Sequence, residues 1–164
     1  TVYAGGNFKE AGEDTVNYIA FWDGNNWYDM DGGVSGRVNA LEIESGILYA
    51  GGEFLEAGGD TVNYLAQWDG AEWRSVGSGV NARVFDIAAD NGNLYVTGDF
   101  QLADTVEVNR LARWDGQEWS NVGGVKDYGV KKIAIYNDLV YAGGDFYKIA
   151  GNDIKFFAEW NADY

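Results

Sequence analysis

The residues of this chain that are best suited to bind a ligand are its seven tryptophans. Exposed indole rings have broad apolar faces that stack on sugar rings, so a repeated Trp could form a multivalent carbohydrate-binding surface. A Trp at the same point of every unit is also what packing between similar units requires, and we predict a structural role for both series. The second series lies on predicted outer strands and is the better candidate for sugar contact. The first series is Trp22, Trp68, Trp114 and Trp160, and the second is Trp27, Trp73 and Trp119.

Asn, Asp and Gly gather in two similar segments, EDTVN at 13–17 and GDTVN at 59–63, and a third segment, DTVEVN at 104–109, is related to them. Oxygen-rich loops of this kind could supply ligands to Ca²⁺, which takes about six to eight oxygens. Asn and Asp in loops more often accept hydrogen bonds from their own backbone, and the third segment displaces its acid relative to Asn109. We therefore predict that these segments form Asx turns and hold no metal.

The segment DGNNW at 23–27, with DGAEW and DGQEW in later copies, resembles the Asp box of sialidases. In that motif one residue separates the Asp from the Gly, whereas here the two are adjacent. The resemblance implies a structural turn, and no cluster that could hold a sialic acid carboxylate is evident among the arginines. These arginines are Arg37, Arg74, Arg83, Arg110 and Arg113.

The composition removes several kinds of active site. The chain has no His and no Cys, so it lacks the usual neutral-pH general base, the Ser/His/Asp and Cys/His nucleophile systems, and the commonest ligands of transition metals. Its 26 acids could include a carboxylate pair for glycoside hydrolysis, but none stands out from the repeat as a singular residue. We predict no catalytic residue, no metal, no cofactor and no enzymatic activity.

The charge and hydropathy of the chain restrict its partners. Eleven Lys and Arg oppose 26 Asp and Glu, which gives a net charge of −15. Such a field repels phosphate backbones, and no segment approaches the run of about 20 apolar residues that crosses a bilayer. We predict neither nucleic-acid binding nor membrane insertion.

The elements that must position these side chains repeat with a period of 46 residues. Segment 48–73 is a near copy of segment 2–27, and the tyrosines at 3, 49, 95 and 141 keep the same spacing. A period of this length is typical of an architecture in which each unit buries its faces against its neighbours. The units are 2–47, 48–93, 94–139 and a partial fourth unit, 140–164.

Each unit is predicted to be a four-stranded antiparallel meander. Segments 83–89 and 93–100 are rich in β-forming residues and are separated by the turn sequence Asp90, Asn91, Gly92. Segments 109–114 and 118–122 follow, joined through Asp115 and Gly116, a pair that favours a two-residue primed turn.

The pattern LYAGGEF, AGGDTVN, YLAQWDG, EW and SVGSGVNARV resembles the kelch-like, galactose-oxidase-type propeller repeats of large bacterial surface proteins. It is also similar to the repeats of fungal cortical polarity markers. The Trp-Asp pairs are shared with WD-repeat proteins, but the Gly-His signature of those repeats is missing. The resemblance implies an all-β fold, a β-propeller segment built from four-stranded antiparallel blades, and an extracellular or cell-surface location. It does not carry the activity of galactose oxidase, whose copper site needs His and Cys.

We expect residues 1–164 to form a single propeller segment. The chain starts at the second strand of its first blade and stops at the third strand of its last, so the four blades have three, four, four and three predicted strands, which makes 14, where four complete blades would need 16. We therefore expect the segment to be part of a larger or partner-closed propeller, completed by neighbouring blades, a protein partner or self-association. The function predicted is a noncatalytic module for protein interaction or structural assembly, and the alternative is a carbohydrate-binding propeller.

Overall fold

The computed structural model describes residues 1–125, 129–149 and 152–161. Of Trp160 it describes the backbone but not the side chain. In these residues the chain forms 20 strands and no helix, and every strand pair is antiparallel. The described residues include no helix that is long and apolar enough to cross a membrane. The prediction of an all-β chain is therefore confirmed.

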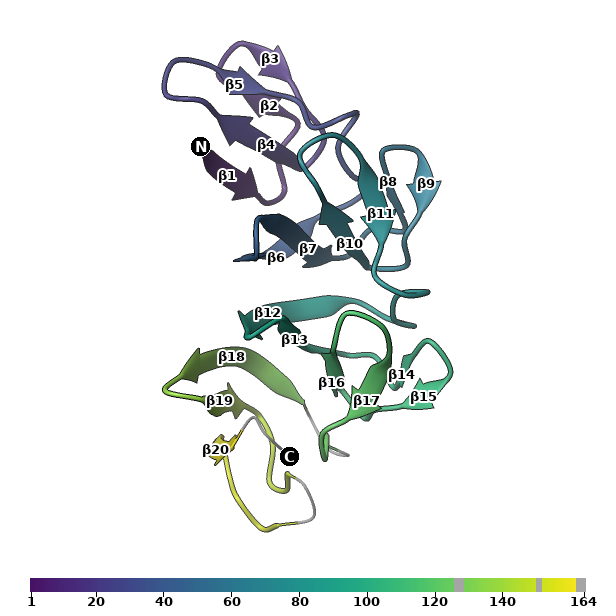
Figure 1. Cartoon of the computed structure of the whole chain (residues 1–164), viewed down its shortest axis with the longest axis vertical. Coiled ribbons are helices and arrows are strands. Elements are labelled where there is room, and N and C mark those ends of the chain that lie inside the picture. The colour runs from purple at the N-terminus through teal and green to yellow at the C-terminus, as the bar shows by residue number, and fades with distance from the viewer. Residues whose placement is uncertain (126–128, 150–151, 162–164) are drawn as a thin grey trace.

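Four sheets follow one another along the chain and stack along the long axis of the molecule (Figure 1). Sheet 1 contains β1 (Val2–Gly5), β4 (Ile19–Trp22) and β5 (Trp27–Tyr28). Sheet 2 contains β6 (Val38–Glu44), β7 (Ile47–Gly52), β10 (Leu65–Trp68) and β11 (Trp73–Ser75). Sheet 3 contains β12 (Val84–Asp90), β13 (Asn93–Gly98), β16 (Leu111–Trp114) and β17 (Trp119–Asn121). Sheet 4 contains β18 (Val130–Tyr136), β19 (Leu139–Gly144) and β20 (Phe157–Asn161).

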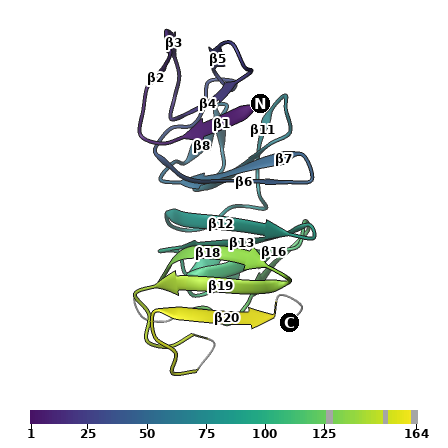
Figure 2. The same ribbon diagram turned by 90° about the vertical axis from the view of Figure 1, so that its left-hand side faces the viewer.

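In sheets 2 and 3 the strands neighbour each other in chain order, as the predicted meander requires. The first strands of sheets 2, 3 and 4, which are β6, β12 and β18, lie side by side across the sheet boundaries (Figure 2). We call these three the inner strands. In each of them the pairing register shifts after its first valine, at Val38, Val84 or Val130, which places a β-bulge at the same point of every unit.

Three short hairpins were not predicted. They are β2 (Glu10–Ala11) with β3 (Asp14–Thr15), β8 (Glu56–Ala57) with β9 (Asp60–Thr61), and β14 (Leu102–Ala103) with β15 (Val106–Glu107). They occupy the segments that we interpreted as Asx-turn loops, so that interpretation is wrong there. Each reverses in a tight turn; in the second hairpin both turn residues, Gly58 and Gly59, have positive φ.

The predicted turn between β12 and β13 is confirmed, whereas the predicted turn between β16 and β17 is wrong. Asn91 and Gly92, both with positive φ, connect β12 to β13 in the predicted hairpin. The connection from β16 to β17 is not a two-residue primed turn, because paired Trp114 and Trp119 enclose four residues and Asp115 does not have positive φ. A longer loop forms there because the Asp115 side chain supplies the turn's hydrogen bonds, as described below.

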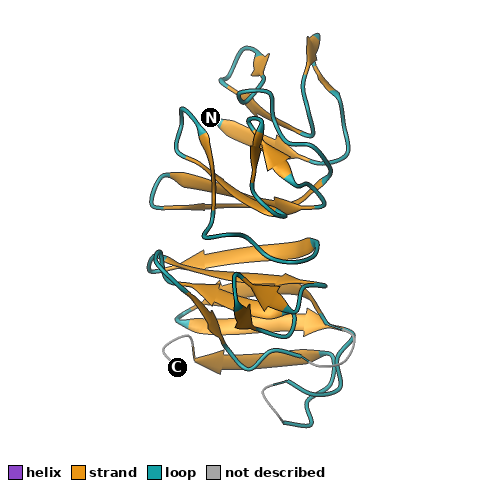
Figure 3. Ribbon diagram, turned by 90° about the vertical axis from the view of Figure 1, so that its right-hand side faces the viewer, coloured by secondary structure: helices purple, strands orange, loops and turns teal. Residues whose placement is uncertain are grey.

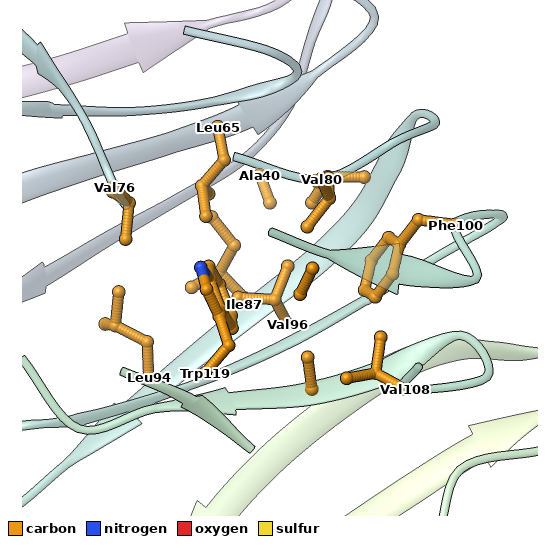
Figure 4. Packing of buried hydrophobic residues seen from close by; sticks show 13 residues of the cluster. Ala40, Leu65, Val76, Val80, Ile87, Leu94, Val96, Phe100, Val108 and Trp119 are labelled. Carbon is orange, nitrogen blue, oxygen red and sulfur yellow. The ribbon is translucent and has the colours of Figure 1, made fainter. Parts of the chain in front are cut away.

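Apolar side chains fill the space between consecutive sheets in three clusters. Alternate residues of a strand point to opposite faces, so sheets 2 and 3 each contribute to two clusters, and sheets 1 and 4 contribute to one each. We call the face toward the preceding sheet the rear face and the face toward the following sheet the forward face. In sheet 3, for example, Leu94 and Val96 pack on sheet 2 from the rear face, while Tyr95 packs toward sheet 4 from the forward face. Figure 4 shows the cluster between sheets 2 and 3, and Figure 3 shows the stack from its other side.

Two glycines let consecutive sheets approach closely. A Cβ atom added at Gly5 would lie 2.5 Å from Cγ1 of Val38, and one added at Gly51 would lie 2.5 Å from Cγ1 of Val84. Both glycines lie on a forward face, and both valines begin the inner strand of the next sheet. The first glycine of the YAGG motif is therefore explained by inter-sheet packing at these two positions.

Candidate functional site

Two pockets occupy equivalent places in the repeat, where one unit joins the next. We call them junction pocket 1–2, of 290 Å³, and junction pocket 2–3, of 410 Å³. Junction pocket 1–2 is lined by Lys9, Asn17, Gly32, Gly33, Val34, Ser35, Glu56 and Gly59. Junction pocket 2–3 is lined by Leu55, Asn63, Tyr64, Ser78, Gly79, Val80, Asn81 and Asp104. Most of these residues correspond at a spacing of 46, so the pockets are products of the repeat.

The same arrangement of one Asn and one Gly forms a wall of each pocket. In junction pocket 2–3, the Asn63 backbone oxygen accepts the Val80 N–H at 3.1 Å, and its Nδ2 donates to the Ser78 carbonyl at 2.9 Å. Gly79 has φ +79, and a Cβ there would lie 2.5 Å from the Asn63 oxygen, so only glycine fits. The Asn of the TVN motif thus holds the linker that leads to the next sheet.

The same bonds recur in the neighbouring units. Asn17 accepts from Val34 N–H at 3.1 Å and donates to the Gly32 carbonyl at 2.9 Å. In the third unit the Asn109 oxygen accepts from Val125 at 2.7 Å. These contacts place the asparagines of the oxygen-rich segments, while the acids Asp14 and Asp60 are exposed on the short hairpins. No three His, Cys, Asp or Glu side chains gather as a metal site would require within the described parts of the chain.

The short hairpins form the other wall of each pocket. In junction pocket 1–2, Ser35 N–H donates to the Glu56 carbonyl, and the Ser35 hydroxyl accepts the N–H groups of Leu55 and Glu56 at 3.1 and 3.0 Å. Asn81 takes the place of Ser35 in the next unit, where its Oδ1 accepts two N–H groups of the corresponding hairpin. Each pocket is therefore fixed by residues of two consecutive units.

The two pockets differ in the groups that they offer to a ligand. In the first unit the Lys9 ammonium lies 4.1 Å from the centre of the Tyr18 ring and donates to Asn17 Oδ1 at 2.9 Å. The equivalent of Lys9 in junction pocket 2–3 is Leu55, which is 48% exposed beside Tyr64. That pocket therefore combines apolar and aromatic surface with amide, hydroxyl and carboxylate groups.

The outer tryptophans do not form a binding surface in sheets 2 and 3. Trp73 is only 4% exposed and Trp119 only 5% exposed, so the sugar-contact alternative is wrong for these two residues. Each packs against the Trp at the end of the preceding strand, with ring centroids 5.3 Å apart. Trp27, in sheet 1, is half-buried.

In the first Trp series, the structural prediction is confirmed for Trp68, which is 8% exposed, while Trp22 and Trp114 are half-buried. The side chain of Trp160 lies outside the described residues. Trp68 and Trp73 belong to the cluster between sheets 1 and 2.

The segments that resemble an Asp box form side-chain-supported turns. One carboxylate oxygen of Asp69 accepts the N–H groups of Ala71 and Glu72, both at 3.0 Å. Asp23 and Asp115 accept the corresponding pairs at 2.7 to 2.9 Å. These backbone N–H groups lower the pKa of all three carboxyl groups below the ordinary value of 3.8.

This arrangement predicts an acid-dependent loss of stability. Because the three pKa values are lowered by folding, their contribution is fully present above about pH 4 and is lost as pH falls through the lowered values. The melting temperature of the native chain should therefore drop more between pH 5 and pH 3 than that of the triple variant Asp23→Asn, Asp69→Asn, Asp115→Asn. Asp60→Asn, at an exposed hairpin position, is the control. Equal drops in the native chain and the triple variant would contradict the assignment.

Three of the arginines bind different partners in different parts of the fold. Arg74 pairs with Asp69 at 2.9 Å and also with Glu72, and Arg83 pairs with Asp99 at 2.7 Å. Arg113 donates to Asn93 at 3.0 Å. These ties lie in different parts of the repeat and form no carboxylate-binding cluster.

Acids on the inner strands tie consecutive sheets together. Asp86 accepts the Ile133 N–H at 3.0 Å and the Lys132 ammonium at 3.1 Å, and Glu44 accepts the Gly92 N–H at 3.0 Å. Burial raises the pKa of Glu42, and the charges of Asp86 and Glu44 add to the effect.

The prediction that no acid stands out from the repeat is wrong for Glu42, because the equivalent residues in the other units are Ala88 and Ala134. Glu42 too takes part in a contact between sheets, since it accepts the backbone N–H of Ala89 on the next inner strand. Glu42, Glu44 and Asp86 thus have structural partners across the sheet boundaries.

No protein-family model matches this sequence, and comparison with curated proteins gives no match.

Proposed function

We propose that this chain is a noncatalytic module, a segment of an extracellular β-propeller that serves in protein interaction or structural assembly. The observation that carries the proposal is the use of several series of repeated polar residues to hold turns, linkers and neighbouring sheets in place. The asparagines secure the linkers, the Asp-Gly segments cap turns, and the inner-strand acids bridge sheets. The regular stacking of the sheets and the side-by-side inner strands support the propeller assignment.

The charge of the chain favours one class of protein partner. A net charge of −15 attracts basic surfaces and steers their association, and this attraction weakens as salt screens it. We expect the partner to present a cluster of Lys and Arg.

A protein array that includes basic extracellular proteins tests this function. Saturable binding that weakens at least about tenfold between 0.05 and 0.5 M NaCl is expected, as charge steering requires. Binding to no protein, or binding that is indifferent to salt, would contradict the proposal. The same array washed with the denatured chain is the control for nonspecific charge attraction.

Carbohydrate binding is a second candidate, favoured by the recurrence of the junction pockets. Ligand sites commonly combine apolar and aromatic walls with a few polar groups, and Leu55, Tyr64, Asn63 and Asp104 supply both kinds in junction pocket 2–3.

On a glycan array, Tyr64→Ala should abolish any sugar signal if junction pocket 2–3 is the site, because it removes the aromatic wall. Tyr18→Ala, at the equivalent position beside Lys9, is the matched control and should retain the signal. A melting temperature for each variant ensures that loss of binding is not loss of folding. A signal that survives Tyr64→Ala would exclude this pocket.

A further inference from the structure

The forward face of sheet 4 exposes Phe157, an apolar side chain at a position that is buried in the other three sheets. Phe157 is 59% exposed and stacks on Tyr141, with ring centroids 6.0 Å apart. Tyr95, the equivalent of Tyr141 in sheet 3, is 1% exposed. The three equivalents of Phe157 are fully buried, at 0% exposure, and they are Ile19, Leu65 and Leu111.

A glycine on this face also has no close neighbour among the described residues. Gly143 pairs with Phe157 as Gly51 pairs with Leu65, so the two glycines are equivalent. Gly51 is needed because Val84 of the next sheet approaches it closely, whereas a Cβ at Gly143 would come no nearer than 3.9 Å to another described residue. Gly143 does not have positive φ either. At the junction of sheets 3 and 4 the equivalent residue is Thr97, which is fully buried, so the next sheet covers this position even where it is not a glycine.

The internal junctions show which groups occupy such a position. In each case a valine at the start of an inner strand arrives together with a Leu or Ile three residues later. Against Gly5 these are Val38 and Leu41, and against Gly51 they are Val84 and Ile87. The next inner strand carries the same pair, Val130 and Ile133, which are buried between sheets 3 and 4.

We propose that the forward face of sheet 4 is a docking surface for the inner strand of a further sheet of this repeat. The incoming strand carries the Val-x-x-Leu/Ile pattern, its valine lies over Gly143, and its Leu or Ile covers Phe157 and Tyr141. Sheet 1 of a second copy does not fit this description, because its strand order β1-β4-β5 contains no inner strand. The inference extends the assembly role proposed above and is independent of the junction pockets.

The test uses the 164-residue chain and the same chain extended by a second copy of residues 119–161, which continues the 46-residue register. Gly143→Phe is introduced into both. In the extended chain the substitution should lower the melting temperature by about 5 °C or more, because the ring is larger than the Thr97 side chain that the junction of sheets 3 and 4 accommodates and meets the docked valine. In the unextended chain it should change the melting temperature by less than about 1 °C.

A second variant separates docking from folding of the added segment. Val130→Asp in the added copy alone should remove most of the difference that Gly143→Phe makes, as expected for two residues in contact. Equal effects of Gly143→Phe in the two chains would overturn the proposal. So would concentration-dependent self-association of the unextended chain that Gly143→Phe abolishes, since the occupant would then be a second copy. Neither result alters the array experiments, so failure of this inference is distinguishable from failure of the proposed function.

Discussion

Replacing Trp68 with alanine is expected to destabilise the folded chain by about 3–5 kcal/mol, the range for an excavated core aromatic. Trp68 is buried between sheets 1 and 2, where it packs against Trp73 and belongs to the same cluster as Leu48 and Phe54. The substitution therefore leaves a large cavity at a boundary between two units. Urea unfolding followed by far-ultraviolet circular dichroism measures the loss.

Trp22→Ala is the matched control for this prediction. Trp22 has the same place in the repeat and packs against Trp27 with ring centroids 5.6 Å apart, but it is half-buried because the rear face of sheet 1 carries no sheet in this structure. Its loss should cost clearly less than that of Trp68. Equal costs would show that the tryptophan pair itself, and not burial between sheets, supplies the stability.

Gly51→Val is expected to destabilise the chain by about 1–3 kcal/mol through overpacking. The new Cβ would lie 2.5 Å from Cγ1 of Val84 and 3.0 Å from Cδ1 of Ile87, so sheets 2 and 3 must move apart. The cluster between these sheets contains Phe100 and Trp119, and it would lose contacts along its length. The change in unfolding free energy is again the measurement.

Val84→Ala distinguishes overpacking from other effects of losing a glycine. Shortening Val84 makes room at the contact, so the double variant with Gly51→Val should recover part of the stability that the two single variants lose in sum. Strict additivity of the two changes would contradict the close approach as the cause.

The strands of the four sheets could be predicted because their signals are local. Asn91-Gly92 specifies a tight turn, and the flanking segments have enough β-forming residues to define β12 and β13. The short hairpins could not be predicted in this way, since strands of two residues have no alternation. They are defined by bonds to a distant linker, such as Ser35 N–H to the Glu56 carbonyl.

The junction pockets could not be predicted because each is assembled from three separate segments of two units. A signal was nevertheless present in the sequence, where Asn17, Gly33 and Val34 recur as Asn63, Gly79 and Val80. We assigned the carbohydrate-binding alternative to the tryptophans instead. The residue type alone does not show whether a Trp is exposed, because its burial depends on the neighbouring sheet. Similarly, Asp115 next to Gly116 indicated a turn, but its side-chain bonds selected a longer loop than the pair alone suggests.

The difference between the two faces of every sheet has a consequence for how such a gene can change. A forward face fits a rear face, so an in-frame duplication of 46 codons inserts a sheet that matches both of its new neighbours without compensating substitutions. The close similarity of segments 2–27 and 48–73 is what a duplication of this kind leaves in the sequence. The same polarity means that a unit inserted in reverse orientation would present two like faces to each other. Chain length can therefore vary in steps of one unit during evolution, while the direction of the stack stays fixed.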